Sequence, residues 1–534
     1  MKTITHYSNI GYFWRAAARF ISQKRAQARS LSRAGLAVLL AGLCGGMPQH
    51  ASAITASDVA TSINGYNSAF MVSSGSTRNY KKSISNGAKQ TGWGAALCIM
   101  GMQDAYERTG DASHKALVSD LCNTFLNEHP TPWSWTGWND DLAWMSLVMI
   151  RGYQMTGNSR FLTAARSGFD LAWSRGWDTV SNGGGIWELQ PSDVPAGQSP
   201  TKNALSNHPN GTAACLIYKS NHDVWYLDRA KQIYAWSRIN IFNPSTGKVY
   251  TSIKPDGSVD TSSPIYSQGS FIDFANQLHQ ITGDPMYYND AMAAANYTRN
   301  SLTNNGLISN NSSYLDTWAD ELARGLGRFT RDNRLWSTYH GWMLQNADAL
   351  WSRRRTDWNI TWNGWSSQTP TDNTLGCSKF VSAVAWMQFT PPTLPNAIGG
   401  THVIASKVNG IAIDNGGSSA DGAGVILWGK NGGQNQKWNF TPNVDGTWNI
   451  VSQSSWKALE VAGGSTTNGL QMTQWTWNRG SNQRWYVEVQ PDGSYRIRNK
   501  TSGSVLDSSN SSTNGAALKQ WIWNGGNQQL WLLQ

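Results

Sequence analysis

Two aspartates, Asp140 and Asp141, stand side by side in the stretch WTGWNDDLAWMSLVMIRGYQMTG, where a long apolar helix is expected to begin. Paired carboxyl groups can do glycosidase chemistry, one as nucleophile and the other as proton donor. Neighbouring side chains at a helix start diverge by about 100°, so their carboxyl groups can lie a few ångströms apart. This spacing favours the retaining reaction, which needs about 5–5.5 Å, over the inverting one. Their repulsion raises the pKa of one carboxyl and keeps a proton available.

The same pair has a purely structural interpretation. Asn139 can cap the helix, and acidic residues in the first turn interact favourably with the helix dipole, by about 0.3–1 kcal/mol each. For an arbitrary Asp-Asp pair this bland interpretation would be preferred. The choice therefore depends on the rest of the chain.

Other polar and aromatic residues have side chains suited to contacting a sugar in a cleft. For the tryptophans among them, structural packing and sugar stacking are equally good interpretations. The candidates are Lys202, Asn203 and Asn207 at a helix start, Tyr266 and Gln268 after a proline turn, and Trp133, Trp135, Trp138 and Trp187.

The composition also points to carbohydrate. The chain has 29 tryptophans and 52 glycines, and only 14% of its residues are charged. A tryptophan offers a flat apolar face on which the C–H face of a sugar ring can stack. The nine histidines show no metal-ligand spacing, and the Gly-rich stretch NGGGIW lacks the strand and helix of a phosphate loop. We therefore expect no metal and no cofactor.

The first 53 residues have the pattern of a secretory signal. They carry seven basic residues and no acidic ones, then the apolar run AGLAVLLAGLCGGM and the small-residue stop ASA. We expect cleavage between Ala53 and Ile54 and a secreted protein. The apolar run is too short to span a membrane comfortably, so no membrane association is expected. Removing seven positive charges lowers the formal net charge from +10 to about +3, which leaves no argument for nucleic-acid binding.

Four cysteines remain after the signal segment: Cys98, Cys122, Cys215 and Cys377. In an exported protein they can pair as disulfides in three ways. Four buried free thiols are the alternative, and the sequence leaves both open.

The part before residue 390 contains a weak repeat of helical hairpins. Each unit reads as a helix end, a tight turn and a second helix, with Gly110, Gly157 and Gly283 at the left-handed position that ends the first helix. The helix after Asp141 is apolar nearly all round, so we expect it to be buried on both sides. Repeated hairpins with buried inner helices predict an all-α (α/α) toroid.

The part after residue 400 contains a threefold repeat. Its units close on Gln-x-Trp motifs whose tryptophans, Trp438, Trp485 and Trp531, are spaced 47 and 46 residues apart. Three units of this length with short strands predict an all-β β-trefoil, with these tryptophans in the shared core. The domains expected are 1–53 (signal), 54–390 (toroid), 391–400 (a Pro/Gly linker) and 401–534 (trefoil).

The trefoil repeat resembles ricin B-type lectins, also called carbohydrate-binding modules of family 13. Such modules bind sugar in each lobe with an acidic residue, an aromatic platform and an Asn-Gln pair. Glu460 and Gln528 depart from the pattern, and a degenerate trefoil with only its core tryptophans intact is the alternative. The matching residues are Asp414, Trp428, Asn435 and Gln436, then Glu460, Trp475, Asn482 and Gln483, then Asp507, Trp521 and Gln529.

The hairpin domain resembles glycoside hydrolase family 76, the endo-α-1,6-mannanases. The resemblance lies in WNDDLAWMSLVMIRGYQMTGNSRFLTAA, in NGGGIWELQ followed by TKNALSNHPNGTAACLIY, and in PIYSQGSFIDFANQLHQITGDPMYYNDA. Glu188 and Ser267 depart from the family motifs. The resemblance implies retention, with Asp140 as nucleophile and Asp141 as general acid/base.

We therefore expect a secreted, monomeric enzyme that hydrolyses α-1,6-mannan and is tethered to polysaccharide by its lectin domain. One alternative keeps the fold but transfers the glycan to a sugar acceptor. The other is a lectin without catalysis, in which the aspartates matter only for stability.

Overall fold

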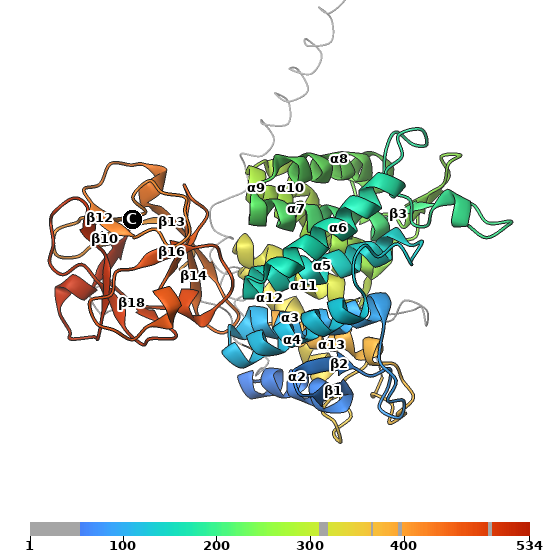
Figure 1. The fold of residues 1–534 in the computed structure, drawn as a ribbon, viewed down its shortest axis with the longest axis horizontal. Helices are drawn as coiled ribbons and strands as arrows, with labels where there is room; N and C mark the ends of the chain where they lie inside the picture. Colours follow the sequence, from blue (N-terminus) through green and yellow to red (C-terminus); the bar gives the residue numbers. More distant parts are fainter. Residues whose placement is uncertain (1–53, 309–318, 365–366, 393–397, 490–493) are drawn as a thin grey trace, which may run out of the picture. The chain divides into compact units, whose positions relative to one another are not determined.

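The computed structural model describes residues 54–308, 319–364, 367–392, 398–489 and 494–534. A helical domain, blue through green and yellow to light orange in Figure 1, precedes an all-β domain in darker orange to red. The expected signal segment and residues 393–397 of the expected linker lie outside the described residues.

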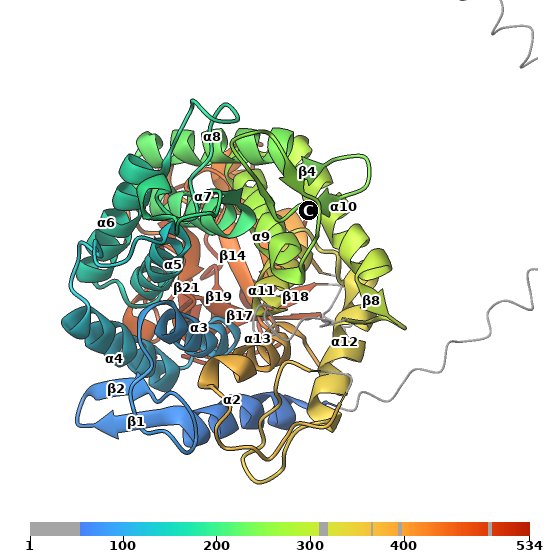
Figure 2. The same ribbon diagram turned by 90° about the vertical axis from the view of Figure 1, so that its right-hand side faces the viewer.

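The described part of the helical domain contains twelve α-helices. Six of them contact one another in a closed series, α3 to α5, α7, α9, α11 and α13 and back to α3. Figure 2 views this ring along its axis and shows the remaining helices outside it. The inner helices are α3 (Gly92–Thr109), α5 (Asn139–Thr156), α7 (Ala204–Asn221), α9 (Ile265–Thr282), α11 (Ala319–Asp332) and α13 (Val381–Phe389). The outer helices are α2 (Ala56–Phe70), α4 (Ala112–Glu128), α6 (Ser159–Gly176), α8 (Val224–Asn240), α10 (Pro285–Ser301) and α12 (Trp336–Ser352).

Left-handed residues end several inner helices where the chain turns outward. Gly110, Gly157 and Gly283 have φ of 64°, 77° and 71°, as the sequence predicts. The end of α7 uses His222 instead, with φ of 57°, a position that the sequence did not reveal. These turns place each outer helix against its own inner helix.

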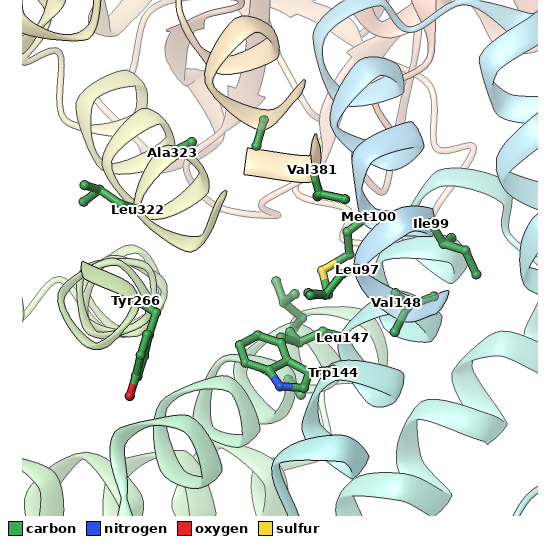
Figure 3. Close-up of a cluster of buried hydrophobic side chains, with 14 of the residues drawn as sticks. Leu97, Ile99, Met100, Trp144, Leu147, Val148, Tyr266, Leu322, Ala323 and Val381 are labelled. Atoms are coloured by element: carbon green, nitrogen blue, oxygen red, sulfur yellow. The ribbon is translucent and has the colours of Figure 1, made fainter. Parts of the chain in front are cut away.

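The inner helices are buried on nearly all sides, which confirms the expectation for the helix after Asp141. Leu142, Trp144 and Leu147 of α5 point in different directions and are all at most 5% exposed. Figure 3 shows Leu97 and Met100 of α3, Trp144 and Leu147 of α5 and Val381 of α13 gathered between the inner helices. This packing fixes the helix starts that carry the polar candidates.

The β domain is a single sheet in which six strands also pair in a closed series. The pairing runs from β10 to β13, β14, β17, β18 and β22 and returns to β10. Shorter strands complete three similar lobes. The strands are β10 (Gly400–Ser406), β11 (Ala412–Asp414), β12 (Ile426–Trp428), β13 (Lys437–Pro442), β14 (Trp448–Ser452), β15 (Ala458–Glu460), β16 (Thr473–Trp475), β17 (Arg484–Val489), β18 (Tyr495–Asn499), β19 (Val505–Asp507), β20 (Ala516–Ala517), β21 (Lys519–Trp521) and β22 (Trp531–Leu533).

The Gln-x-Trp tryptophans form the centre of the β domain, as the sequence predicts. Trp438, Trp485 and Trp531 are fully buried in one hydrophobic cluster. Each indole N–H donates to a backbone carbonyl one hairpin away, at 3.0, 3.0 and 3.2 Å. The repeat in the sequence is therefore a repeat in the core.

None of the helices that the structure describes is long and apolar enough to cross a membrane.

Candidate active site

Asp140 and Asp141 lie in the first turn of α5, and a second segment of the chain runs alongside them. Trp138, the residue before the helix, forms a β-bridge with Leu189. The backbone N–H of Asn139 donates to the carbonyl of Glu188 at 2.8 Å. The Gly-rich segment and the Asp-Asp motif, about 45 residues apart in sequence, therefore lie side by side. We call these two paired segments, with the carboxyl groups they carry, the wall of the candidate site.

Asn139 does not cap the helix, so that part of the structural interpretation is wrong. The N-cap position belongs to Trp138, which makes no side-chain capping bond. The Asn139 amide instead donates to the Trp187 carbonyl at 2.8 Å and accepts from Arg175 Nε at 2.8 Å. These bonds connect the start of α5 to its neighbours. The Asn139 side chain does not cap the helix because its hydrogen-bonding groups are used by these tertiary partners.

Asp141 has partners that favour its ionised form. The hydroxyl of Thr136 donates to its Oδ2 at 2.8 Å. Burial raises the pKa of Asp141, while the bond from Thr136 and the nearby guanidinium of Arg175 act in the opposite direction. Asp141 therefore retains some stabilisation as an anion.

Asp140 is less favoured as an anion, although the backbone N–H groups of Asp140 and Asp141 act to lower its pKa. Its Oδ1 is buried and has no hydrogen-bond partner among the described residues. Burial, followed by the negative charges of Asp141 and Glu188, raises the pKa of Asp140 well above its ordinary value. The unpaired oxygen is an acceptor that a hydroxyl donor from a bound sugar would satisfy.

Glu188 is a third carboxyl group of the site, and the sequence reasoning noted it only as a departure from the family motif. Its Oε2 accepts from the Thr201 hydroxyl at 2.6 Å. Burial raises its pKa, and hydrogen bonds from Thr201 and Asn203 oppose the rise. Its position directly after Trp187 in the Gly-rich segment was the sequence signal that could have identified Glu188 as a site residue.

Lys202 is turned away from solvent and holds the Gly-rich segment. Its ammonium group donates to the carbonyls of Asp178 at 2.8 Å, Ser181 at 2.5 Å and Gly184, and lies 3.0 Å from the Asp178 carboxylate. It also stacks on the Trp187 ring, 4.6 Å from the centroid. Since its donors are all engaged by the protein, the structure places Lys202 behind the wall of the site.

Asn203 and Asn207 also bond to the wall from within. Asn203 caps α7, accepting from the Ser206 N–H at 2.8 Å. Asn207 accepts from the Ile186 N–H at 2.8 Å and donates back to the Ile186 carbonyl at 3.0 Å. Both are buried, so their bonds position the residues before Glu188.

Tyr266 and Gln268 lie in the first turn of α9, and their side chains have different surroundings. Burial and the charges of Glu188, Asp260 and Asp140 raise the pKa of Tyr266. Gln268 is fully buried, with its amide 2.7 Å from the Ser263 hydroxyl. The structure thus places Tyr266 within reach of the charges of Glu188 and Asp140, and the Gln268 amide against Ser263.

The tryptophans of the region separate into packed and exposed ones. Trp133 and Trp187 are buried, at 0% and 6% exposed. Trp135 and Trp138, on either side of Thr136 and Gly137, are 54% and 44% exposed. Trp93, at the start of α3, is 37% exposed and was not among the sequence candidates. The exposed ones are suited to stacking against sugar rings.

The first two lobes of the β domain repeat one constellation around a buried carboxylate. In the first lobe Asn435 and Gln436 donate to Asp414 Oδ2 at 2.7 and 3.0 Å. In the second, Asn482 and Gln483 donate to Glu460 Oε2 at 3.2 and 3.1 Å.

The third lobe is incomplete. Gln529 donates to Asp507 at 2.9 Å, but Gln528 donates to Asn524 at 3.2 Å. The departure at Gln528 noted in the sequence therefore leaves Asp507 with one amide partner instead of two.

The aromatic platforms Trp428, Trp475 and Trp521 are 39%, 42% and 37% exposed. A turn from a neighbouring lobe supports each one. Its Asp or Asn accepts the backbone N–H just after the tryptophan, at 2.7, 2.6 and 2.8 Å. The following glycine lies against the indole ring, with its Cβ position 3.9, 3.4 and 3.0 Å from the nearest ring atom, and its φ of 85°, 80° and 80° is one that other residues rarely adopt. These turns, which the sequence reasoning missed, are Asn514–Gly515, Asp421–Gly422 and Asn468–Gly469.

Within the described residues, no group of three or more His, Cys, Asp or Glu side chains could hold a metal ion.

The sequence and the fold both match known glycosidases. The sequence model of glycosyl hydrolase family 76 matches residues 54–390, and that of the ricin-type β-trefoil lectin-like domain matches residues 434–521. The α-1,6-mannanase of Salegentibacter sp. HEL1_6 is 24% identical, with a TM-score of 0.55 over 62% of this chain and 98% of its own. An α-mannanase of family 76 from Bacteroides thetaiotaomicron is 19% identical, with a TM-score of 0.53 over 62% and 94%.

A variant of the Salegentibacter enzyme, with two consecutive aspartates replaced by asparagine, is described as inactive and was solved with α-1,6-mannotriose. No curated protein matches the chain.

Proposed function

Because the chain belongs to glycosyl hydrolase family 76, we propose that it is a secreted, retaining endo-α-1,6-mannanase whose lectin-like domain holds it on polysaccharide. We place the reaction in an (α/α) six-hairpin barrel and the tether in a β-trefoil. The closed series of inner helices supports the first assignment, and the three similar lobes support the second.

One observation carries the proposal: two adjacent carboxyl groups in different environments at the start of an inner helix. Asp141 accepts a hydrogen bond from Thr136, whereas Asp140 has a buried oxygen with no hydrogen-bond partner in the part of the chain that the structure describes. A retaining glycosidase needs one ionised and one protonated carboxyl group. The consecutive aspartates of the inactive Salegentibacter variant support the same pair in this chain.

In the proposed reaction, Asp140 attacks the anomeric carbon and Asp141 protonates the leaving oxygen. Asp141 then takes a proton from water, which releases the glycosyl group from Asp140. In the free site a charge on Asp140 is disfavoured. Hydroxyl donors of the bound sugar would stabilise that charge and leave the proton on Asp141.

Exposed tryptophans extend the proposed site along a polysaccharide chain. The Trp135 ring contacts Gly92, at 3.7 Å from the position that a Cβ would take there. Gly92 directly precedes Trp93 in the chain. Trp138 directly precedes the helix that carries both aspartates. We propose that these rings stack on mannose units flanking the bond that is cleaved.

Reducing-sugar release from linear α-1,6-mannan tests the reaction. Asp140→Asn and Asp141→Asn should each lower it by about 100- to 10,000-fold at an unchanged melting temperature. Trp428→Ala in the lectin-like domain serves as a folded control that retains hydrolysis of short oligosaccharides. An inactive, folded wild type would refute the mannanase assignment.

Azide tests the two roles separately. In Asp141→Ala, azide should attack the glycosyl-enzyme and give a glycosyl azide with retained configuration. In Asp140→Ala, azide should take the place of the nucleophile and give the inverted product. The opposite pattern would exchange the two roles.

Product analysis with a sugar acceptor separates hydrolysis from transfer. Free reducing ends in the presence of excess oligomannoside support hydrolysis, and elongated products instead indicate transglycosylation. A lectin without catalysis would produce neither.

A further inference from the structure

Two of the four cysteines bring their thiols together in the helical domain. Cys98 lies on α3, and Cys377 begins the short 3₁₀ helix Cys377–Phe380 that leads into α13. Their Sγ atoms are 3.2 Å apart although the residues are 279 positions apart in the chain. In Figure 3, Met100 of α3 lies beside Val381 of α13, which shows the same meeting of the two segments.

This meeting point is the place where the ring of inner helices closes. α3 is the first inner helix and α13 the last, and they contact each other directly. The chain between Cys98 and Cys377 includes the other inner helices, α5, α7, α9 and α11. A covalent bond here would join the two ends of the ring.

The other two cysteines have no such neighbour among the described residues. Cys122 Sγ accepts a weak bond from Gln103 Nε2 at 3.8 Å, and Cys215 lies on α7. All four are fully buried. The chain therefore supplies two buried cysteines as internal controls.

The surroundings make the Cys98 thiol a poor nucleophile once the domain has folded. Burial and the neighbouring Cys377 raise the pKa of the Cys98 thiol. The Tyr66 hydroxyl donates to the Cys377 carbonyl at 3.4 Å. Neither cysteine belongs to the wall that carries the aspartates, so this pair has no part in the proposed reaction.

We propose that Cys98 and Cys377 form a disulfide that closes the helical ring. One thiolate attacks a disulfide oxidant, which is a small or protein disulfide, and forms a mixed disulfide with release of one thiol. The second thiolate then displaces the oxidant's other sulfur. Two cysteine thiols are oxidised, the oxidant is reduced to two thiols, and the protons pass to those thiols. Because both sulfurs are buried in the folded domain, the exchange must occur while α3 and the Cys377 segment meet and before the surrounding side chains are fully packed.

Peptide mapping of the full chain, exported to an oxidising compartment and kept unreduced, tests the bond. We expect a peptide pair joined through Cys98 and Cys377 that is two hydrogens lighter than the separate peptides. Cys122 and Cys215 should be alkylated after denaturation without reduction. Alkylation of all four cysteines, or a bond between other partners, would overturn the proposal.

Melting with and without reductant tests the effect on the ring. A crosslink across a long loop destabilises the unfolded chain, so reduction should lower the melting temperature of the wild type by about 5 °C. The double variant Cys98→Ser, Cys377→Ser should melt like the reduced wild type and ignore reductant. Cys122→Ser is the matched control and should keep the response. Equal responses in all three proteins would contradict the proposal, whatever the enzyme's activity.

Discussion

Asp140 and Asp141 are neighbours in sequence, yet their surroundings give them different proton affinities. The sequence predicted that repulsion raises the pKa of one of the two carboxyl groups, because repulsion between adjacent carboxylates requires no knowledge of the fold. It could not predict that Thr136 bonds Asp141 alone or that Glu188 lies near Asp140. These partners come from tertiary packing.

Glu188 offers a residue-scale test of this electrostatic arrangement. Its negative charge favours the protonated form of Asp140, so Glu188→Gln should lower the pKa of Asp140. The ionised nucleophile then persists to lower pH, and the acidic limb of the kcat/KM profile should move toward lower pH. Asp141, Tyr266 and Arg175 remain unchanged around the site.

The control is Asp228→Asn, which removes an exposed carboxylate from the outer helix α8. It should leave the limb in place. If Glu188→Gln also leaves it in place, the charge of Glu188 does not govern the ionisation of Asp140.

At the scale of elements, the hairpins were predictable and the wall beside α5 was not. Glycine stops and helical periodicity are local signals, so Gly110, Gly157 and Gly283 identified the hairpin turns. The bridge between Trp138 and Leu189 joins segments about 50 residues apart and has no local signature. For this reason Asn139 was assigned to capping, although it joins the Gly-rich segment to α5.

Lys202 tests whether the wall depends on its buried support. Lys202→Met keeps the aliphatic stem but leaves the carbonyls of Asp178, Ser181 and Gly184 without their donor. We expect a loss of about 1–3 kcal/mol of unfolding free energy, together with a lower kcat/KM because Glu188 is displaced. Thermal melting and kinetics on α-1,6-mannan measure the two effects.

Lys254→Met, at an exposed position, is the matched control and should change neither quantity. A normal melting temperature with a large loss of activity in Lys202→Met would point to direct contact with the substrate instead.

For the molecule as a whole, the sequence repeats predicted the architecture. Single residues that depart from the repeat pattern predicted where one repeat differs from the others. Three Gln-x-Trp units implied three similar lobes around one core, and Trp438, Trp485 and Trp531 form that core. The turns that support the platforms, such as Asp421–Gly422 beneath Trp475, involve contacts between lobes. They were not predictable because each lobe's motif was interpreted by itself.

Incomplete bonding in the third lobe predicts that the lobes contribute unequally to binding. Trp428 and Trp475 belong to lobes in which two side-chain amides hold the carboxylate, whereas in the lobe of Trp521 Gln529 is the one side-chain amide among the described residues that donates to Asp507. Trp428→Ala and Trp475→Ala should each weaken retention on insoluble α-mannan by about 2- to 10-fold, and Trp521→Ala by less than about twofold.

Hydrolysis of a soluble short mannoside should stay unchanged in all three variants, because a tether acts by raising local substrate concentration rather than by touching the reacting bond. Equal losses of retention in the three variants would show that the second amide is not needed for sugar binding. Unchanged retention in all of them would remove the tethering role from this domain and leave the helical domain to bind the polysaccharide alone.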